Sequence, residues 1–149
     1  MIFREAFPGD ISQIQRVRNS VNENVLSDPA IVTNADCERY LVERGKGWVC
    51  EAGNWIVGFS IVDLLDRNVW ALFVDPHFEK MGIGRRLHED MLAWYFSRAD
   101  ATLWLSTAPG TRAEGFYRAA GWKYVGLYRK TELKFELTAD EWRRRYLSN

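Results

Sequence analysis

The sequence has few cysteines, carries no net charge and contains no long apolar run. Its 149 residues include only Cys37 and Cys50, whose spacing indicates neither a disulfide framework nor a zinc site. Its 20 basic and 20 acidic residues cancel, which argues against nucleic acid or an anionic membrane as the main partner. No segment could span a bilayer and MIFREAFPGD lacks a signal-peptide layout. We therefore expect one cytoplasmic domain over residues 1–149, without a metal site.

The composition that is present is globular and rich in aromatic residues. Hydrophobic residues make up 47% of the chain and aromatic residues 14%. At this length such a composition allows a core of ordinary size. Most of the aromatic side chains are expected inside that core.

Apolar patterns and turn residues predict a fold in which strands and helices alternate. Strands are predicted at Ile2–Ala6, Trp48–Ala52, Trp55–Leu65, Val69–Val74, Ala101–Thr107, Trp122–Tyr128 and Thr131–Leu137. Helices are predicted after an Asp10 cap, from Thr33 to about Gly45, from Ile83 onward, at Thr111–Ala120 and at Ala139–Leu147. Capping boxes are predicted at Thr33–Asp36 and between Thr138 and Glu141, a hairpin turn at Gly53-Asn54 and a helix end at Gly121. The predicted apolar stripes are Ile11, Ile14, Val17 and Val21 in the first helix, and Ile83, Leu87, Met91 and Trp94 in the helix from Ile83. The order β-α-α-β-β-β-α-β-α-β-β, with a short final helix, predicts an α/β fold with a mixed sheet covered by helices. The apolar run Val69–Val74 is typical of a strand buried on both faces.

The loop after this strand is the main candidate for a binding site. The segment VDPHFEKMGIGRRLHEDML places Gly82 and Gly84 just before Arg85 and Arg86, where a helix is predicted to begin. Cationic side chains there oppose the helix dipole, whereas glycines and unpaired amides at a helix start favour an anion. A bound phosphate group is one explanation, and a tight turn with two solvated arginines is the other.

Two common nucleotide-binding motifs do not fit this loop. A P-loop requires Gly-Lys followed by Ser or Thr, which the chain lacks. A dinucleotide fingerprint requires a third glycine, where Leu87 stands instead. It also requires an acidic residue at the end of the next strand, and Ala101–Thr107 contains none.

Two motifs together resemble those of the GCN5-related N-acetyltransferase (GNAT) superfamily. EKMGIGRRL is similar to its coenzyme A motif, and TRAEGFYRAAGW (Thr111–Trp122) is similar to its later Phe-Tyr helix. With the order of elements, the resemblance covers Ile2–Leu137. It implies a mixed, mostly antiparallel central sheet flanked by helices on both faces. It also implies an N-acetyltransferase that moves the acetyl group of acetyl-CoA directly to a primary amine of a small molecule or peptide.

The resemblance further implies roles for single residues. Near the end of the motif strand, the backbone of Leu72, Phe73 and Val74 would bind the acetyl carbonyl and the pantetheine arm. Main-chain amides would hold the pyrophosphate, with the two arginine side chains assisting, at Lys80, Met81, Gly82, Ile83, Gly84, Arg85 and Arg86. Thr107 and Phe116 would complete the coenzyme site. Tyr117 would lie near the sulfur, where a neutral hydroxyl can protonate the leaving thiolate; a plain core aromatic is the alternative.

Several positions depart from the superfamily pattern. Glu79 stands where Arg or Gln is usual, and we expect its carboxylate to point away from the phosphates. Lys80 replaces a frequent glycine and can add a positive contact. Thr107 and Gly110 stand where asparagines are common, which puts one contact to the pantetheine arm in doubt.

The general base is not identified by the sequence. Glu51, Asp63 and Asp66 are the nearest carboxylates by strand position, and each is expected to be a surface or turn residue. His88 is expected to face solvent from its helix. An acyl-CoA-binding module without catalysis is therefore the alternative function, and a structural domain is a third.

The acceptor is also not identified. By resemblance it would bind between Asn22–Ile31 and Leu127–Leu133. The sequence allows a homodimer, because edge strands and aromatic residues are available for one.

Overall fold

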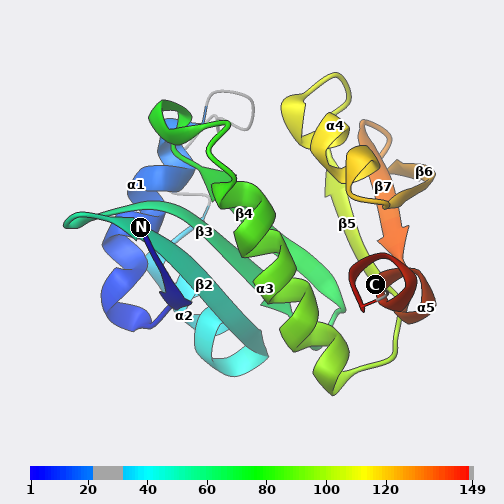
Figure 1. The fold of residues 1–149 in the computed structure, drawn as a ribbon, viewed down its shortest axis with the longest axis horizontal. Helices are drawn as coiled ribbons and strands as arrows, with labels where there is room; N and C mark the ends of the chain where they lie inside the picture. Colours follow the sequence, from blue (N-terminus) through cyan, green and yellow to red (C-terminus); the bar gives the residue numbers. More distant parts are fainter. Residues whose placement is uncertain (22–31, 148–149) are drawn as a thin grey trace. The chain divides into compact units, whose positions relative to one another are not determined.

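The structure, a computed structural model, describes residues 1–21 and 32–147 (Figure 1). The chain forms two compact units, Met1–Tyr95 and Phe96–Asn149. The expected acceptor segment Asn22–Ile31 lies outside the described residues. Among the helices of the described ranges, none combines the length and apolar character that crossing a membrane requires.

Four antiparallel strands form the sheet of the first unit, in the order β1-β2-β3-β4. They are β1 (Ile2–Glu5), β2 (Gly45–Ala52), β3 (Trp55–Asp63) and β4 (Asn68–Val74). The helical segments are a 3₁₀ turn (Pro8–Asp10), α1 (Ile11–Ser20), α2 (Asn34–Glu38) with a π-helical continuation (Arg39–Arg44), a second 3₁₀ turn (Pro76–Phe78) and α3 (Ile83–Arg98). Gly53, with φ of 64°, makes the predicted β2–β3 hairpin turn.

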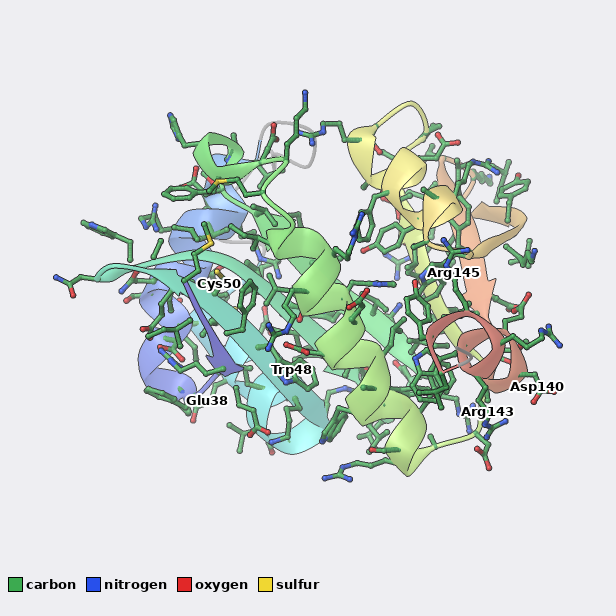
Figure 2. The ribbon with its side chains drawn as sticks, viewed as in Figure 1. Glu38, Trp48, Cys50, Asp140, Arg143 and Arg145 are labelled. Carbon is green, nitrogen blue, oxygen red and sulfur yellow. The ribbon has the colours of Figure 1, made fainter. Side chains whose placement is uncertain are left out.

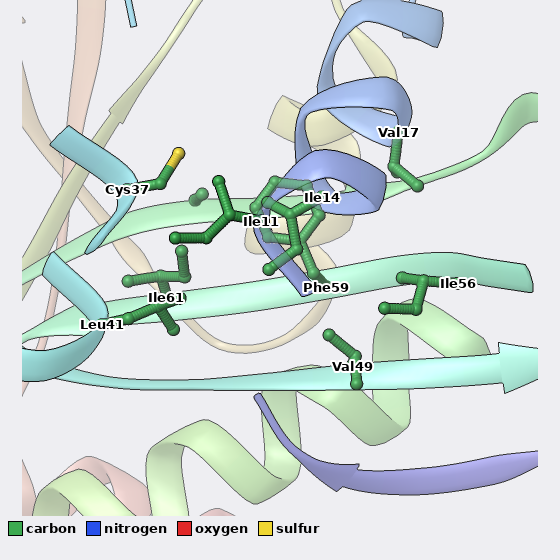
Figure 3. Packing of buried hydrophobic residues seen from close by; sticks show 10 residues of the cluster. Ile11, Ile14, Val17, Cys37, Leu41, Val49, Ile56, Phe59 and Ile61 are labelled. Carbon is green, nitrogen blue, oxygen red and sulfur yellow. The ribbon is translucent and has the colours of Figure 1, made fainter. Parts of the chain in front are cut away.

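One face of this sheet shares a core with α1, because alternate strand residues point to the same side. Phe59 and Ile61 of β3 are fully buried and belong to one cluster with Ile14 and Val17 of α1 (Figure 3). Ile11 joins them at helical spacing. The apolar stripe predicted for this helix is therefore confirmed as the buried one.

The opposite face of β3 packs against α3. A Cβ added at Gly58 would lie 3.0 Å from Ile83 and 3.1 Å from Leu87, so the missing side chain lets the helix approach. The Ser60 hydroxyl donates to the Leu87 carbonyl at 3.3 Å. Helices thus cover both faces of the sheet, and the ribbon shows α1 and α3 on opposite sides (Figure 1).

Three strands belong to the second unit and pair antiparallel, in the order β5-β7-β6. Its strands are β5 (Leu103–Thr107), β6 (Lys123–Tyr128) and β7 (Glu132–Leu137). Its helices are α4 (Arg112–Ala119) and α5 (Ala139–Trp142), which continues as a π-helix (Arg143–Leu147). Phe135 and Leu137 of β7 are fully buried.

Capping residues hold the ends of these helices. Thr138 accepts from the Glu141 amide at 3.1 Å, and the Glu141 carboxylate accepts from the Thr138 amide at 2.9 Å, which is the predicted capping box. Gly121 ends α4 with φ of 98°, also as predicted. Arg143 fixes the last helix by bonds of 3.0 Å to Asp140 and Asp100 (Figure 2).

Two details of the prediction are wrong. In β4 only Val69 and Ala71 are buried, whereas the residues that follow are half-buried. An unbroken apolar run shows that a strand is hydrophobic, but it does not determine how much of each face neighbouring elements shield from solvent. Asp10 makes no capping bond to α1, because a 3₁₀ turn precedes this helix. Its carboxylate instead accepts from the Phe7 amide at 3.0 Å.

Candidate functional site

The end of β4 is fixed by a buried carboxylate. Asp75 accepts hydrogen bonds from the His77 amide at 2.9 Å and contacts the His77 ring at 3.1 Å. Its own amide donates to the Val57 carbonyl of β3 at 2.8 Å. Burial opposes ionisation, but the bonds from His77 lower the pKa of Asp75 below its ordinary value. These bonds therefore fix the backbone where the chain leaves β4.

The following loop has the backbone geometry of an anion site. Lys80 and Gly82 have φ of 62° and 82°, which turns successive peptide groups to one side. The first hydrogen bond across the start of α3 runs from the Arg86 amide to the Gly82 carbonyl, at 3.1 Å. The amides of Ile83, Gly84 and Arg85 precede it and are therefore the orphan donors of this helix. A Cβ added at Gly82 would meet no heavy atom within 4 Å, so the space above it is open.

The two arginines at the helix start differ in their contacts. Arg86 pairs with Asp90, one turn along α3, at 3.1 Å, and its guanidinium lies 4.7 Å from the centre of the Phe3 ring. Arg85 is exposed. The contacts with Asp90 and Phe3 therefore explain in part why an arginine is placed at position 86, at a helix start. Its predicted assistance to a phosphate group stays a prediction.

The strand that precedes this loop contains a bulge. Ala71 pairs with Ile61 and Val69 with Val62, so Trp70 is an extra residue in β4. Beyond the bulge, Leu72, Phe73 and Val74 pair with β3 residues Ser60, Phe59 and Gly58. Bulges redirect side chains and are frequent beside active sites. The three residues expected to bind the acetyl carbonyl therefore follow directly after a redirected segment of backbone.

Sequence reasoning missed Arg18, which is buried beside these residues. Its side chain is only 8% exposed and lies over the rings of Trp70 and Phe73. Arg18 continues the stripe of Ile11 and Ile14 at helical spacing. A charged residue in line with an apolar stripe is the signal that could have found it.

The remaining predicted site residues belong to the second unit. Tyr117 of α4 is buried and makes edge-on contacts with Phe116 and Trp122, at centroid distances of 5.3 and 5.7 Å. Burial raises the pKa of the Tyr117 hydroxyl, so it stays protonated at neutral pH. Thr107 is buried at the end of β5, where it pairs with Leu133 of β7. The predicted site residues thus divide between the two units, with the loop in the first.

The candidate carboxylate bases are already engaged by arginines. Asp63 is 1% exposed and so is not a surface residue, but it is the expected turn residue, because it accepts from the amides of Leu65 and Asp66. It also accepts from Arg44 Nη2 at 2.8 Å. Arg44 also pairs with Asp66 at 3.1 Å. Glu51 accepts from Arg4 Nε at 2.7 Å. These ion pairs join residues far apart in the chain, which strand position alone does not reveal.

The expectation that His88 faces solvent is also wrong. Its side chain is 1% exposed, because α3 is buried over a face wider than the stripe of Ile83, Leu87 and Met91. The described residues contain no group of three or more His, Cys, Asp or Glu that could hold a metal ion.

Comparison with known families agrees with this geometry. The model of the acetyltransferase (GNAT) family matches residues 11–122, which include the loop and the Phe-Tyr helix. No curated protein matches the sequence significantly.

Solved structures share the fold at low sequence identity. PaiA N-acetyltransferase from Thermoplasma acidophilum, in complex with coenzyme A, has a TM-score of 0.80 at 13% identity, over 92% of this chain and 98% of that one. An acetyltransferase of the GNAT family from Staphylococcus aureus Mu50 has 0.79 at 15%, over 93% and 98%. Ribosomal-protein-alanine N-acetyltransferase from Brucella melitensis has 0.72 at 18%, over 93% and 99%. The predicted fold class is thereby confirmed.

Proposed function

Because the chain belongs to the acetyltransferase (GNAT) family, we propose that it transfers the acetyl group of acetyl-CoA to a primary amine of a small molecule or peptide. We take residues 1–149 as a single acetyltransferase domain. The observation that carries the proposal is the geometry of the loop before α3. A Cβ added at Gly82 would meet no heavy atom within 4 Å, and the three amides that follow have no partner within the helix. The coenzyme A complex of the structurally similar PaiA enzyme supports the choice of donor.

The loop suits the pyrophosphate of coenzyme A. Main-chain amides from Lys80 to Arg85 offer several donors at a helix start, where partial positive charge favours an anion. Gly82 keeps the approach open, since a side chain would occupy the place of the phosphate. Arg85 is exposed and able to add a charge-assisted contact.

The transfer itself requires an oxyanion donor and an acid. The amine nitrogen attacks the thioester carbon, and a backbone N–H among Leu72, Phe73 and Val74 stabilises the negative charge that develops on the oxygen. The carbon–sulfur bond then breaks and the sulfur leaves as a thiolate. Tyr117 donates its proton to that thiolate, and the proton released by the amine restores the hydroxyl.

No carboxylate of the described residues is assigned as general base. Glu51, Asp63 and Asp66 each hold an arginine, and moving one of them to the amine would break its ion pair. We therefore assign removal of the amine proton to water, which suits an acceptor that binds in its neutral form.

The proposal is tested by following free thiol while the protein is mixed with acetyl-CoA and a panel of amines. Thiol release with at least one amine is expected, and none with any amine would refute the proposal. Coenzyme A binding without turnover would favour the alternative, a non-catalytic acyl-CoA-binding module.

A Tyr117→Phe variant tests the role of the acid. We expect turnover to fall by about a hundredfold or more, with unchanged affinity for coenzyme A in a titration. Because the raised pKa keeps Tyr117 protonated, the loss should be the same from about pH 7 to pH 9. Unchanged turnover in this variant would exclude Tyr117 as the acid.

A further inference from the structure

Arg18 of α1 is a buried charge with two unused hydrogen-bond donors among the described residues. Its Nε and Nη2 atoms are buried and make no hydrogen bond with the described residues. The guanidinium carbon lies 4.8, 5.1 and 5.8 Å from the ring centres of Trp70, Phe73 and Phe59. These rings stabilise the positive charge by cation–π attraction, but they accept no conventional N–H hydrogen bond.

Among the residues that the structure describes, the group whose charge acts on Arg18 does not neutralise it. Cys37 is the group whose charge would interact with Arg18, and it is fully buried. Burial raises the pKa of the Cys37 thiol, and the opposing effect of Arg18 is smaller, so the thiol stays neutral at neutral pH. A buried guanidinium without a partner is costly. A ligand that supplies the partner is one explanation for such a group.

The two unused nitrogens are arranged to bind a carboxylate. Nε and Nη2 lie on the same edge of a guanidinium and form a planar fork that matches two carboxylate oxygens. Arg44 of the same unit uses this edge for a carboxylate, since its Nε and Nη2 both donate to Asp63 Oδ2, at 3.2 and 2.8 Å. Arg18 thus presents the same edge without the carboxylate.

The position of Arg18 connects it to the proposed reaction. Its guanidinium touches the ring of Phe73, whose backbone is one of those proposed to hold the thioester oxygen, and the ring of Trp70 at the bulge. It reaches them from α1, the opposite side of the sheet from α3, whose start carries the pyrophosphate loop. A group bound to Arg18 would therefore lie on the acceptor side of the acetyl group.

We propose, resting on the proposed function, that Arg18 binds a carboxylate of the acceptor, so that the enzyme acetylates amines that carry a carboxylate in the same molecule. The ring faces of Phe59, Trp70 and Phe73 hold the guanidinium in place. Because both nitrogens are buried, the acceptor reaches them after side-chain rotation, which is common at binding sites.

The test compares unbranched amino carboxylates of increasing length with their carboxamides, by thiol release from acetyl-CoA. We expect the wild-type protein to prefer the best carboxylate over its carboxamide by about ten- to a hundredfold, the value of a charge-assisted pair. Arg18→Met should remove this preference by lowering the rate with the carboxylate about ten- to a hundredfold relative to the carboxamide. Arg39→Met removes an exposed arginine near α2 and should keep the preference.

The melting temperature separates a binding role from a structural one. Without ligand, Arg18→Met should melt at the same or a higher temperature than the wild type, because it removes an uncompensated buried charge. Millimolar amino carboxylate should raise the melting temperature of the wild type and not of Arg18→Met.

Each outcome bears on a different claim. Thiol release with equal use of carboxylates and carboxamides, or a preference that survives in Arg18→Met, overturns the inference and leaves the acetyltransferase proposal intact. If no thiol is released with any amine, the acetyltransferase proposal fails, and the shift in melting temperature alone tests whether Arg18 binds a carboxylate. A shift that requires Arg18 then supports the carboxylate site, and its absence overturns it.

Discussion

Replacing Gly82 by valine tests the loop on which the proposed function depends. Gly82 has φ of 82°, a conformation that costs an L-residue about 1–2 kcal/mol and a β-branched one more. Open space around its Cβ position means that no clash adds to this strain. For a chain of this length, each kcal/mol lowers the melting temperature by about 2–4 °C.

A matched control separates this strain from the loss of a ligand. Gly53 has φ of 64° and open space at its Cβ position, but it lies in the β2–β3 hairpin turn. Gly53→Val should therefore lower the melting temperature by a similar amount and bind coenzyme A as the wild type does.

The two variants should differ in an isothermal titration with coenzyme A. In Gly82→Val the added side chain fills the approach to the orphan amides of α3. The loss of one or two bonds to a charged group, at about 1.5–3 kcal/mol each, weakens binding by about tenfold to ten-thousandfold. If Gly82→Val binds coenzyme A as tightly as Gly53→Val, the pyrophosphate is held elsewhere and the assignment of this loop is wrong.

Two further predictions concern stability. Ile14→Ala leaves a cavity at a fully buried position and should reduce the free energy of unfolding, measured by urea titration, by about 2–5 kcal/mol. Val42→Ala, at an exposed position, should change it little. Equal effects of the two variants would mean that this core is misassigned. Burial opposes ionisation of Asp10, but bonds from Arg4 and the Phe7 amide lower its pKa below the ordinary 3.8. The stability that Asp10 contributes is therefore complete above about pH 4 and lost as the pH falls below it. In Asp10→Asn the free energy of unfolding should depend less on pH in this acid range, and an unchanged slope of that free energy against pH would contradict the prediction.

Much of the fold could be predicted because it depends on residues close together in the chain. The capping boxes of Thr33 with Asp36 and Thr138 with Glu141 each join residues three positions apart, and both form as predicted. The turn at Gly53 and the end of α4 at Gly121 need only a positive φ, which glycine accepts. Such signals are read directly from short segments.

The family likewise followed from short motifs at fixed spacing. The two glycines at the start of α3 and the Phe-Tyr helix were sufficient to indicate the GNAT family, which the match over residues 11–122 shows. Their contact with coenzyme A stays a prediction, because it depends on a ligand rather than on the chain's own elements.

What the sequence determined by itself was therefore the order of elements, their caps and turns, and the family. Only the tertiary structure decided which polar groups are buried and what they meet. It buried His88, joined Asp63 to Arg44 from another element, and placed Arg18 against Trp70 and Phe73. The physical reason is that burial and ion pairing depend on contacts between distant segments, whereas caps and turns depend on the geometry of a few successive residues.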